Sequence, residues 1–291
     1  MSEQKQPVSV VGLGDMGAAL ALAFVDAGHP TTVWNRTIEK ADRLVQMGAT
    51  AAPSLVAAAS ASPLVVVNVT GGEVARGLLE RAGDALAYSD VVNLSDGTAG
   101  DARRTAAWAA AHGVGYVHGQ IETIPAGIGD PSSVIVYGGS AEVYERHRTT
   151  LDVLAGNGRL VSDDPGTAAL FGMGIHSVMW GLLNGFVHAA GMLTAEGVEV
   201  GAFLAGADVQ LRQLHDFLGV LAAEIDKDEY AVPTSGLAAH LPSIEDLLRQ
   251  GEDVGLDNEL VEVTRRWVAR AVGDGHGADN YSRLVDYVRA G

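Results

Sequence analysis

The chain has no cysteine, few positive charges and one long stretch with no charge at all. The absence of cysteine among 291 residues excludes disulfides, thiolate catalysis and thiolate-bound metals, and a reducing cytoplasm is the simplest setting for it. With 19 Lys and Arg against 36 Asp and Glu, the net charge is −17, which makes nucleic acid and anionic membranes poor partners. The polar segment 1–7 leads directly into an apolar run, so we expect no signal peptide. We expect a cytoplasmic protein that binds no nucleic acid, membrane or metal ion.

The uncharged stretch, Pro165–Ala195, is long enough to span a bilayer. It contains His176 and His188, however, and acidic residues flank it at Asp164 and Glu196, contrary to the pattern of a cytoplasmic anchor. We interpret it as a long helix that protein buries on all sides. Since a single chain of this size rarely covers a helix so completely, the stretch predicts a homodimer.

A glycine-rich turn follows the first apolar run. Residues 8–11 are typical of a buried strand, and after them come Gly-Leu-Gly-Asp-Met-Gly, a helix pattern and a second β-branched run that ends at Trp34. This context makes G-x-G-x-x-G a dinucleotide fingerprint, in which phosphate binds at the helix N-terminus. The predicted cofactor-binding residues of this turn are Gly12, Leu13, Gly14, Asp15, Met16 and Gly17.

The end of the second strand distinguishes the two nicotinamide cofactors. An NAD enzyme normally carries Asp or Glu there, which binds the ribose 2′-hydroxyl and repels a 2′-phosphate. This chain has Asn35, Arg36 and Thr37 instead. Arg36 can bind the phosphate through its guanidinium fork, while Asn35 and Thr37 supply neutral donors. The sequence therefore predicts NADPH, and Thr37 also fits the N-cap of a helix at 38–46.

Strand and helix patterns alternate through the first half of the chain. The predicted strands lie at 64–68, 91–94, 115–118, 134–137 and 158–161, and the predicted helices at 72–86, 101–112 and 141–154. This alternation is typical of an α/β fold with a doubly wound parallel sheet, which binds ligands at the carboxyl ends of its strands. We therefore expect Val69, Thr70, Asn93 and Ser95 to contact the cofactor.

The strand signal disappears in the second half. Helix patterns at 211–225, 244–250 and 258–272 indicate an all-α domain. The predicted organisation is a Rossmann domain at 1–164, an interdomain helix at 165–195 and a helical dimerisation and substrate domain at 196–291.

Several motifs together resemble the imine reductase and reductive aminase family, over nearly the whole chain. They are GLGDMG at 12–17, WNRT at 34–37, VNLSDGT at 92–98, YVHGQIETIPAGIG at 116–129, MWGLLNGFVHA at 179–189 and RAVGDGHGADNYSRLVDYVR at 270–289. The resemblance implies NADPH-dependent reduction of a cyclic imine, an iminium ion or a ketone–amine adduct. It also implies an intertwined, domain-swapped homodimer with active sites formed between subunits.

The chain departs from this family at the expected proton donor. The family commonly carries Asp or Tyr on the interdomain helix, with a second polar residue two turns earlier, and these positions align with Trp180 and Gly172. Neither can protonate an imine, so Trp180 is left to shape the site. His176 shares their helix face and is either an acid or a core residue. His240 is the other candidate acid, and the resemblance implies that Gly172, Gln210 and Ala239 line the substrate.

Asp96 follows a central strand, where a carboxylate would stabilise a cationic iminium in a dry pocket. Its alternative reading is an ordinary turn aspartate in Ser-Asp-Gly.

Other functions remain open at this stage. The related β-hydroxyacid dehydrogenases place a lysine on the interdomain helix and a Ser-Gly-Gly loop against the substrate carboxylate. This chain has no lysine in Pro165–Ala195, and the corresponding loop reads Gly119-Gln120-Ile121-Glu122. A reductase of activated ketones would need a strong acid, which would make His176 or His240 obligatory. A non-catalytic NADPH-binding protein is a further alternative.

Overall fold

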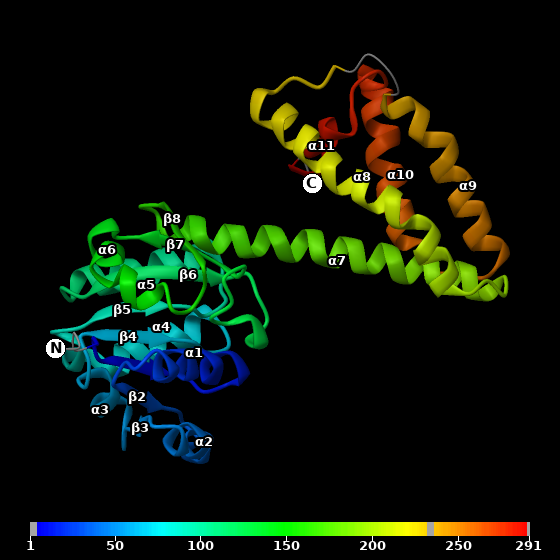
Figure 1. Ribbon diagram of the computed structural model, residues 1–291. Coiled ribbons are helices and arrows are strands. Elements are labelled where there is room, and N and C mark those ends of the chain that lie inside the picture. Colours follow the sequence, from blue (N-terminus) through cyan, green and yellow to red (C-terminus); the bar gives the residue numbers. More distant parts are fainter. Residues whose placement is uncertain (1–4, 232–235, 290–291) are drawn as a thin grey trace. The chain divides into compact units, whose positions relative to one another are not determined.

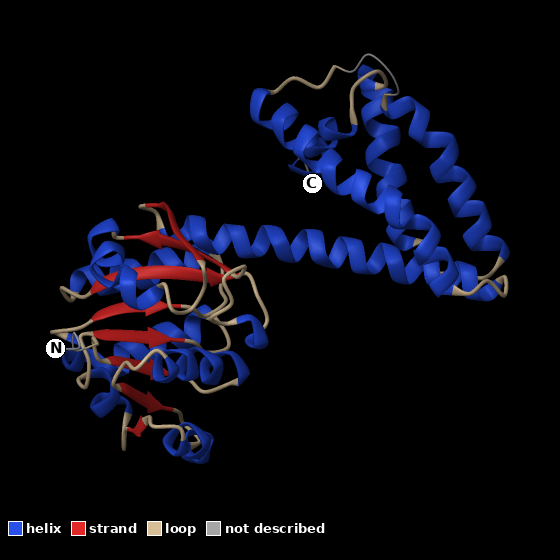
Figure 2. Cartoon of the chain, in the orientation of Figure 1, coloured by secondary structure: helices blue, strands red, loops and turns tan. Residues whose placement is uncertain are grey.

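The computed structural model describes residues 5–231 and 236–289 and consists of two compact units, Met1–Ser177 and Val178–Gly291. The first unit contains a β-sheet with helices, and the second is helical (Figure 1, Figure 2). Helix α7, Pro165–Ala195, has its first part in one unit and its remainder in the other. The sequence-based division treats this helix as a segment of its own, and that division stays a prediction.

The first unit is built on one sheet of eight strands in the order β3-β2-β1-β4-β5-β6-β7-β8. Every neighbouring pair is parallel except β6 and β7. The strands are β1 Val8–Val11, β2 Thr31–Trp34, β3 Thr50–Ala51, β4 Leu64–Val67, β5 Asp90–Asn93, β6 Gly115–Ile121, β7 Val134–Gly139 and β8 Asn157–Ser162. The predicted doubly wound α/β fold is confirmed, but the sheet is not wholly parallel. The β6–β7 connection contains Pro125 and Pro131 and forms no crossover helix, which a parallel pair would require.

Helices cover both faces of the sheet. They are α1 Asp15–Asp26, η1 Ile38–Ala41, α2 Asp42–Gln46, α3 Leu55–Ala59, α4 Gly72–Ala82, η2 Gly83–Leu86, α5 Ala99–Ala111, η3 Pro125–Gly127 and α6 Ala141–Leu151. One core joins β-strand residues to Phe24 of α1 and Tyr144 of α6, and the other joins them to Leu79 of α4 and Ala109 of α5. The side chains alternate between these two cores along each strand, as the pleat requires.

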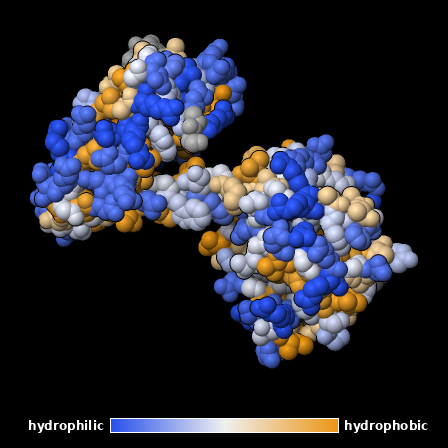
Figure 3. All heavy atoms as spheres, turned by 180° about the vertical axis from the view of Figure 1, so that it is seen from behind, coloured by the Kyte–Doolittle hydropathy of each residue, from blue (hydrophilic) through white to orange (hydrophobic). Residues whose placement is uncertain are grey.

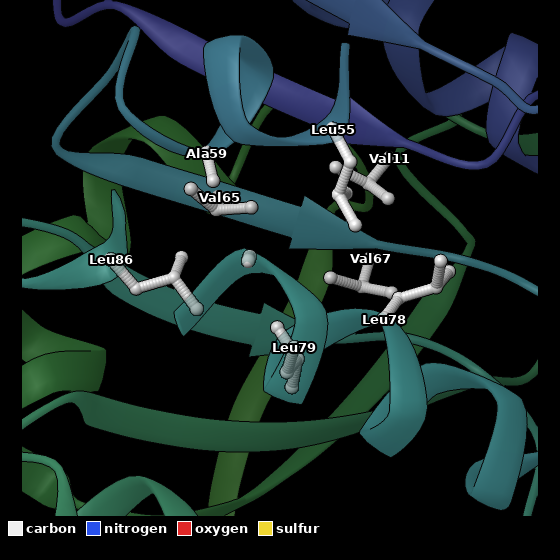
Figure 4. Close-up of a pocket in the computed structure, with 9 residues that line it drawn as sticks. Val11, Leu55, Ala59, Val65, Val67, Leu78, Leu79 and Leu86 are labelled. Carbon is white, nitrogen blue, oxygen red and sulfur yellow. The ribbon is translucent and has the colours of Figure 1, made fainter. Parts of the chain in front are cut away.

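A small void lies within the second of these cores (Figure 4). Nine apolar residues from β1, β4, α3, α4 and η2 line it: Val11, Leu55, Ala59, Val65, Val67, Leu78, Leu79, Ala82 and Leu86. A void without polar lining atoms stays dry and offers nothing to orient a polar ligand. It therefore belongs to the packing of the core and is not a binding site.

The second unit confirms the predicted all-α architecture. Its helices are α8 Val200–Lys227, η4 Leu237–Ala239, α9 His240–Asp253, α10 Glu259–Ala271, η5 Val272–His276, η6 Tyr281–Arg283 and α11 Leu284–Arg289. A small core joins η4, α10 and α11 through Leu237, Val268, Ala271, Leu284 and Tyr287. Helix α8 is much longer than the predicted 211–225, and none of its residues is buried.

Helix α7 extends over the whole uncharged stretch, but this chain covers little of it. Its buried residues are Gly166, Ala168, Ala169 and Gly172, all near its first turns. Large apolar side chains such as Leu182 and Val187 are exposed. Hydrophobic surface lies among hydrophilic surface on both units (Figure 3). Within the described residues α7 is the one helix long and apolar enough to cross a membrane by length and composition. The predicted helix is confirmed, whereas its predicted burial is not provided by a single chain.

A buried polar pair lies at the amino end of β5. Nε2 of His147, a residue 1% exposed, lies 2.8 Å from Oδ2 of Asp90, and Nη1 of Arg146 donates to the same oxygen at 2.6 Å. Burial of the carboxyl opposes its ionisation, but the hydrogen bonds from His147 and Arg146 hold the pKa of Asp90 below its usual value. Asp90 therefore stabilises the fold in its charged form.

Asp90→Asn should lower the free energy of unfolding at pH 7 by about 1.5–3 kcal/mol, the range for hydrogen bonds to charged groups. Because the carboxyl has a lower pKa in the folded state, its contribution is complete above the unfolded value of about 3.9 and is lost as the pH falls through the folded value. Urea denaturation of both proteins should show a difference that shrinks below about pH 4. A difference that persists unchanged in acid would contradict this account.

Candidate functional site

The glycine-rich turn between β1 and α1 has no room for side chains at two of its positions. Gly12 has φ +98°, and a Cβ there would lie 2.1 Å from the carbonyl oxygen of Asn68. A Cβ on Gly17 would lie 2.0 Å from the carbonyl oxygen of Gly12. Gly14, the N-cap of α1, is exposed and has no atom within 4 Å of an added Cβ. Two glycines thus shape the turn, and the third keeps the helix N-terminus open to a ligand.

The loop after β2 is tied to this turn by Asn35. The Leu13 amide donates to Oδ1 of Asn35 at 3.1 Å, and Nδ2 of Asn35 donates to the carbonyl oxygen of Thr37 at 2.9 Å. Thr37 is the N-cap of η1, although its side chain makes no capping bond. Arg36 is exposed between them. The amide of Asn35 therefore holds the loop beside the glycine turn, which leaves Arg36 as the cation that a 2′-phosphate would meet.

The loops after β4 and β5 are bonded to each other. The Val69 amide donates to Oγ of Ser95 at 3.0 Å, and the Ser95 amide donates to Oδ1 of Asn93 at 3.1 Å. Nδ2 of Asn68 donates to the Leu94 carbonyl at 2.6 Å. Asn93 and Ser95 are each 1% exposed, so their side chains fix the loops from inside. Asn68, which sequence reasoning missed, has the same function.

The outer residues of these turns are more accessible. Thr70 and Asp15 are exposed, and Met16 is half-buried and packs against the first core.

A stripe of polar side chains runs along one face of β6 and just beyond it. Tyr116, His118, Gln120 and Glu122 occupy alternate positions, which places them on the same face. The hydroxyl of Tyr116 accepts a hydrogen bond from Nδ2 of Asn93 at 3.2 Å. Burial lowers the pKa of His118 to about 4, so its ring is neutral at pH 7. We call these four side chains the β6 polar stripe.

The far end of this stripe contacts Asp96 and Gly172, which the sequence predicted to lie in the active site. Nε2 of Gln120 donates to Oδ1 of Asp96 at 3.4 Å, and the Gln120 side chain fills the space beside Gly172, where an added Cβ would lie 2.2 Å from its Cδ. Gln120 is 3% exposed, whereas Asp96 is exposed. Asp96 and Gly172 are thus brought together through Gln120.

Gly172→Ala should lower the free energy of unfolding by about 1–3 kcal/mol, because the new methyl group overpacks against Gln120. The double variant Gly172→Ala with Gln120→Ala should recover part of this loss, since it removes the clashing amide. Gly77→Ala is the control, because an added Cβ at this helix position has no atom within 4 Å. Chemical denaturation measures all four proteins, and equal losses at positions 77 and 172 would disprove the clash.

Glu122, at the end of the stripe, lies in the electrostatic field of two candidate residues. Burial raises the pKa of the Glu122 carboxyl above its usual range, His176 acts in the opposite direction and Asp96 adds to the rise. Glu122 and His176 are both half-buried. This end of the first unit therefore gathers Asp96, Gln120, Glu122 and His176.

The remaining candidates belong to the second unit. Trp180 and Gln210 are exposed on α7 and α8, and Ala239 is exposed at the end of η4. The ring of His240 is half-buried and lies edge-on to the ring of Tyr281, with 5.5 Å between centroids. Across residues 5–231 and 236–289, no group of three or more His, Asp or Glu is placed to hold a metal ion.

From the sequence, Glu122 was named only as part of the loop that replaces Ser-Gly-Gly, and the stripe was not identified as a unit. The signal was present, because polar side chains alternate with Val117, Gly119 and Ile121 through a strand whose centre is buried. In a buried strand such alternation indicates a polar site beside the sheet.

Comparison with known proteins gives matches along nearly the whole chain. Residues 7–162 match the NAD binding domain of 6-phosphogluconate dehydrogenase, and residues 164–290 match the family described as NADPH-dependent reductive aminase-like, C-terminal domain. An NADPH-dependent reductive aminase of Aspergillus oryzae is 32% identical over 289 residues, covering 98% of this chain and 97% of that protein.

Two solved structures are similar over almost their full length. A reductive aminase from Aspergillus terreus in complex with NADPH4, cyclohexanone and allyl amine is 36% identical, with a TM-score of 0.90 and coverage of 98% of this chain and 99% of that one. An imine reductase from Myxococcus stipitatus in complex with NADP+ is 29% identical, with a TM-score of 0.92 and coverage of 97% and 99%.

Proposed function

Because the chain belongs to the family of imine reductases and reductive aminases, we propose that it uses NADPH to reduce the C=N bond of imines or iminium ions to amines. The observation that carries this proposal is that the similarity extends over both the nucleotide-binding half and the helical half. The family resemblance seen in the sequence motifs is confirmed.

Bound NADPH supplies the hydride that adds to the C=N carbon. The chain's own residues bind and orient it: the amides at the start of α1 receive the phosphates, and the open position at Gly14 lets them approach. Arg36 binds the 2′-phosphate through charge-assisted hydrogen bonds. Asn35, Asn93 and Ser95 keep the surrounding loops in place from within the chain.

The substrate lies at the carboxyl end of β5 and β6 in this proposal. A carboxylate at Asp96 stabilises the positive charge that develops at nitrogen as hydride approaches carbon. The related Aspergillus terreus enzyme is in complex with a ketone and an amine, which supports reductive amination as a further activity of this chain. Gly172, Gln210 and Ala239 are proposed to line the substrate, and Trp180 to shape the site.

The test is NADPH oxidation with three substrates: a cyclic imine, its N-methyl iminium ion and an activated ketone. We expect turnover of the first two at rates well above that of the ketone. Turnover of the ketone alone would replace the proposal by a ketone reductase of the β-hydroxyacid dehydrogenase type. NADPH binding without turnover of any substrate would identify a non-catalytic binding protein.

We further propose a homodimer whose second copy covers the exposed apolar side chains of α7 and α8. The exposed residues of α7 include Leu170, Phe171, Ile175, Leu182 and Phe186, and those of α8 include Phe203, Leu214 and Phe217. So many large apolar side chains exposed along two long helices are typical of the surface that an obligate subunit interface buries. In such a dimer, His240 of one copy would line the substrate site of the other. A cytoplasmic location accords with a chain that has no cysteine.

Light scattering at micromolar concentration should give twice the chain mass of 30.1 kDa. A stable monomer that reduces imines would contradict both the dimer and the shared active site.

A further inference from the structure

Three neighbouring members of the β6 polar stripe carry buried atoms with no hydrogen-bond partner in the described part of the chain. These atoms are Nε2 of His118, Oε1 of Gln120 and Oε1 of Glu122. Buried polar atoms in folded proteins are almost always bonded, so three on one strand face point to a partner outside the chain. Gln120 is only 3% exposed and donates to Asp96, which directs its amide to the carboxyl end of β5.

The end of the β6 polar stripe lies at the edge of the sheet where this type of fold binds its ligands. Strand β6 runs parallel to β5, with His118 paired to Asn93, so the residues that follow both strands leave the sheet at the same edge. Ligands of doubly wound sheets bind at that edge. Asp96 follows β5, and Glu122 follows β6, which puts both carboxyls at the proposed substrate site.

The surroundings of Glu122 favour its neutral form. Its carboxyl is partly buried, and the charge of Asp96 disfavours a second carboxylate beside it. The charged groups that act on it come from two elements, Asp96 from the loop after β5 and His176 from α7. When two neighbouring carboxyls lie in different environments, one can serve as a proton donor while the other stays charged and stabilises a cation. Here the half-buried Glu122 suits the acid and the exposed Asp96 suits the stabiliser.

We propose that Glu122 is the catalytic acid that protonates the imine nitrogen, an inference that rests on the proposed function. The O–H bond of the Glu122 carboxyl breaks and an N–H bond forms, which gives an iminium cation and a Glu122 carboxylate. Hydride addition at carbon then yields the neutral amine, and a proton from water restores the acid. Gln120 is a positioning residue, because its amide orients Asp96.

This assignment explains how the chain works without an acid at positions 172 and 180. Gly172 has no side chain, and the side chain of Gln120 occupies the space beside it. A member of the β6 polar stripe therefore lies where the family carries a polar side chain on the helix. The acid is thereby supplied from the sheet instead of from helix α7. His176 modulates Glu122 electrostatically and is not itself required to donate a proton.

The experiment compares Glu122→Gln with the wild-type protein on a neutral cyclic imine and on its N-methyl iminium ion. The amide has the size of the acid but no proton to transfer, so kcat for the neutral imine should fall by ~10²-fold or more, and the permanently charged substrate should be much less affected. Glu122→Asp should retain part of the activity toward the neutral imine. The melting temperature and the Kd for NADPH should be unchanged in Glu122→Gln.

Three variants serve as comparisons. Glu142→Gln removes a carboxylate that is 82% exposed and should leave both rates unchanged. His176→Phe and His240→Phe test the two competing acids, and neither should separate the substrates as Glu122→Gln does.

Equal losses for both substrates, an unaffected neutral imine, or a selective loss in a histidine variant would overturn the assignment of Glu122. A wild-type protein that reduces neither substrate would refute the proposed function as well, and the wild-type rate thus distinguishes the two failures.

Discussion

Gly14→Ala is expected to weaken NADPH binding by more than tenfold, about 1.4 kcal/mol, while the free energy of unfolding stays nearly unchanged. The reason is that a Cβ at this position would meet no atom of the chain within 4 Å, and its φ of −69° suits any residue. The methyl group would instead occupy the place where phosphate approaches the amides at the start of α1. Isothermal titration with NADPH and urea denaturation measure the two quantities.

Two further glycine variants separate binding from folding. Gly12→Ala should impair both, because its Cβ would lie 2.1 Å from the Asn68 carbonyl oxygen in a backbone with φ +98°. Gly28→Ala has a similar φ of +81° but open space, so it should destabilise by only about 1–2 kcal/mol and leave NADPH binding intact. An undiminished NADPH affinity in Gly14→Ala would show that phosphate does not bind at this turn.

Much of the sheet could be predicted because its signals are local. Val8–Val11 is buried throughout and directly precedes the glycine turn, and Leu64–Val67 is a continuous apolar run that is also buried throughout. Strand β3 and helix α3 were missed, since Thr50–Ala51 and Leu55–Ala59 are too short to show a period. Strand direction is not encoded locally either, which is why the antiparallel pairing of β6 with β7 came only from the structure.

The candidate site, like the sheet, has some features that the sequence predicts and others that only the structure gives. The roles of Gly12 and Gly17 follow from the fingerprint, and the structure gives the close approaches that require glycine there. Ser95 and Asn93 were predicted to contact the cofactor, and that stays a prediction; the hydrogen bonds that the structure adds for their side chains lie inside the chain. The hydrogen-bond partner of a loop side chain can belong to the loop after a neighbouring strand, as Ser95 and Val69 show. The sequence of one loop alone therefore does not predict this partner.

Helix α8 was predicted least well in the helical half, because its apolar residues are not covered within the chain. Helix α8 has no buried residue, although Phe203, Leu214 and Phe217 recur along it. Its beginning at Val200 was missed since Gly201 and Gly206 weaken the helix signal there. The apolar pattern of such a helix indicates that something covers it, but it contains no information on the covering partner.

Arg36→Ala is expected to raise the Michaelis constant for NADPH by roughly 10- to 100-fold and to leave that for NADH nearly unchanged, a loss of about 1.5–3 kcal/mol that is typical of hydrogen bonds to charged groups. Arg36 is exposed in the loop that Asn35 holds beside the glycine turn, so its guanidinium is available to the 2′-phosphate. NADH lacks that phosphate and loses no ionic contact. Steady-state kinetics with both cofactors give the ratio directly.

Arg43→Ala is the matched control, because it removes the same charge from an exposed position in the neighbouring helix α2. If general electrostatic attraction of the phosphates were responsible for selectivity, both variants would weaken NADPH to a similar extent, and the effect would disappear at high salt. A specific contact predicts instead that Arg43→Ala behaves like wild type. Equal losses for NADPH and NADH in Arg36→Ala would show that Arg36 does not recognise the 2′-phosphate and that cofactor selectivity lies elsewhere in the loop.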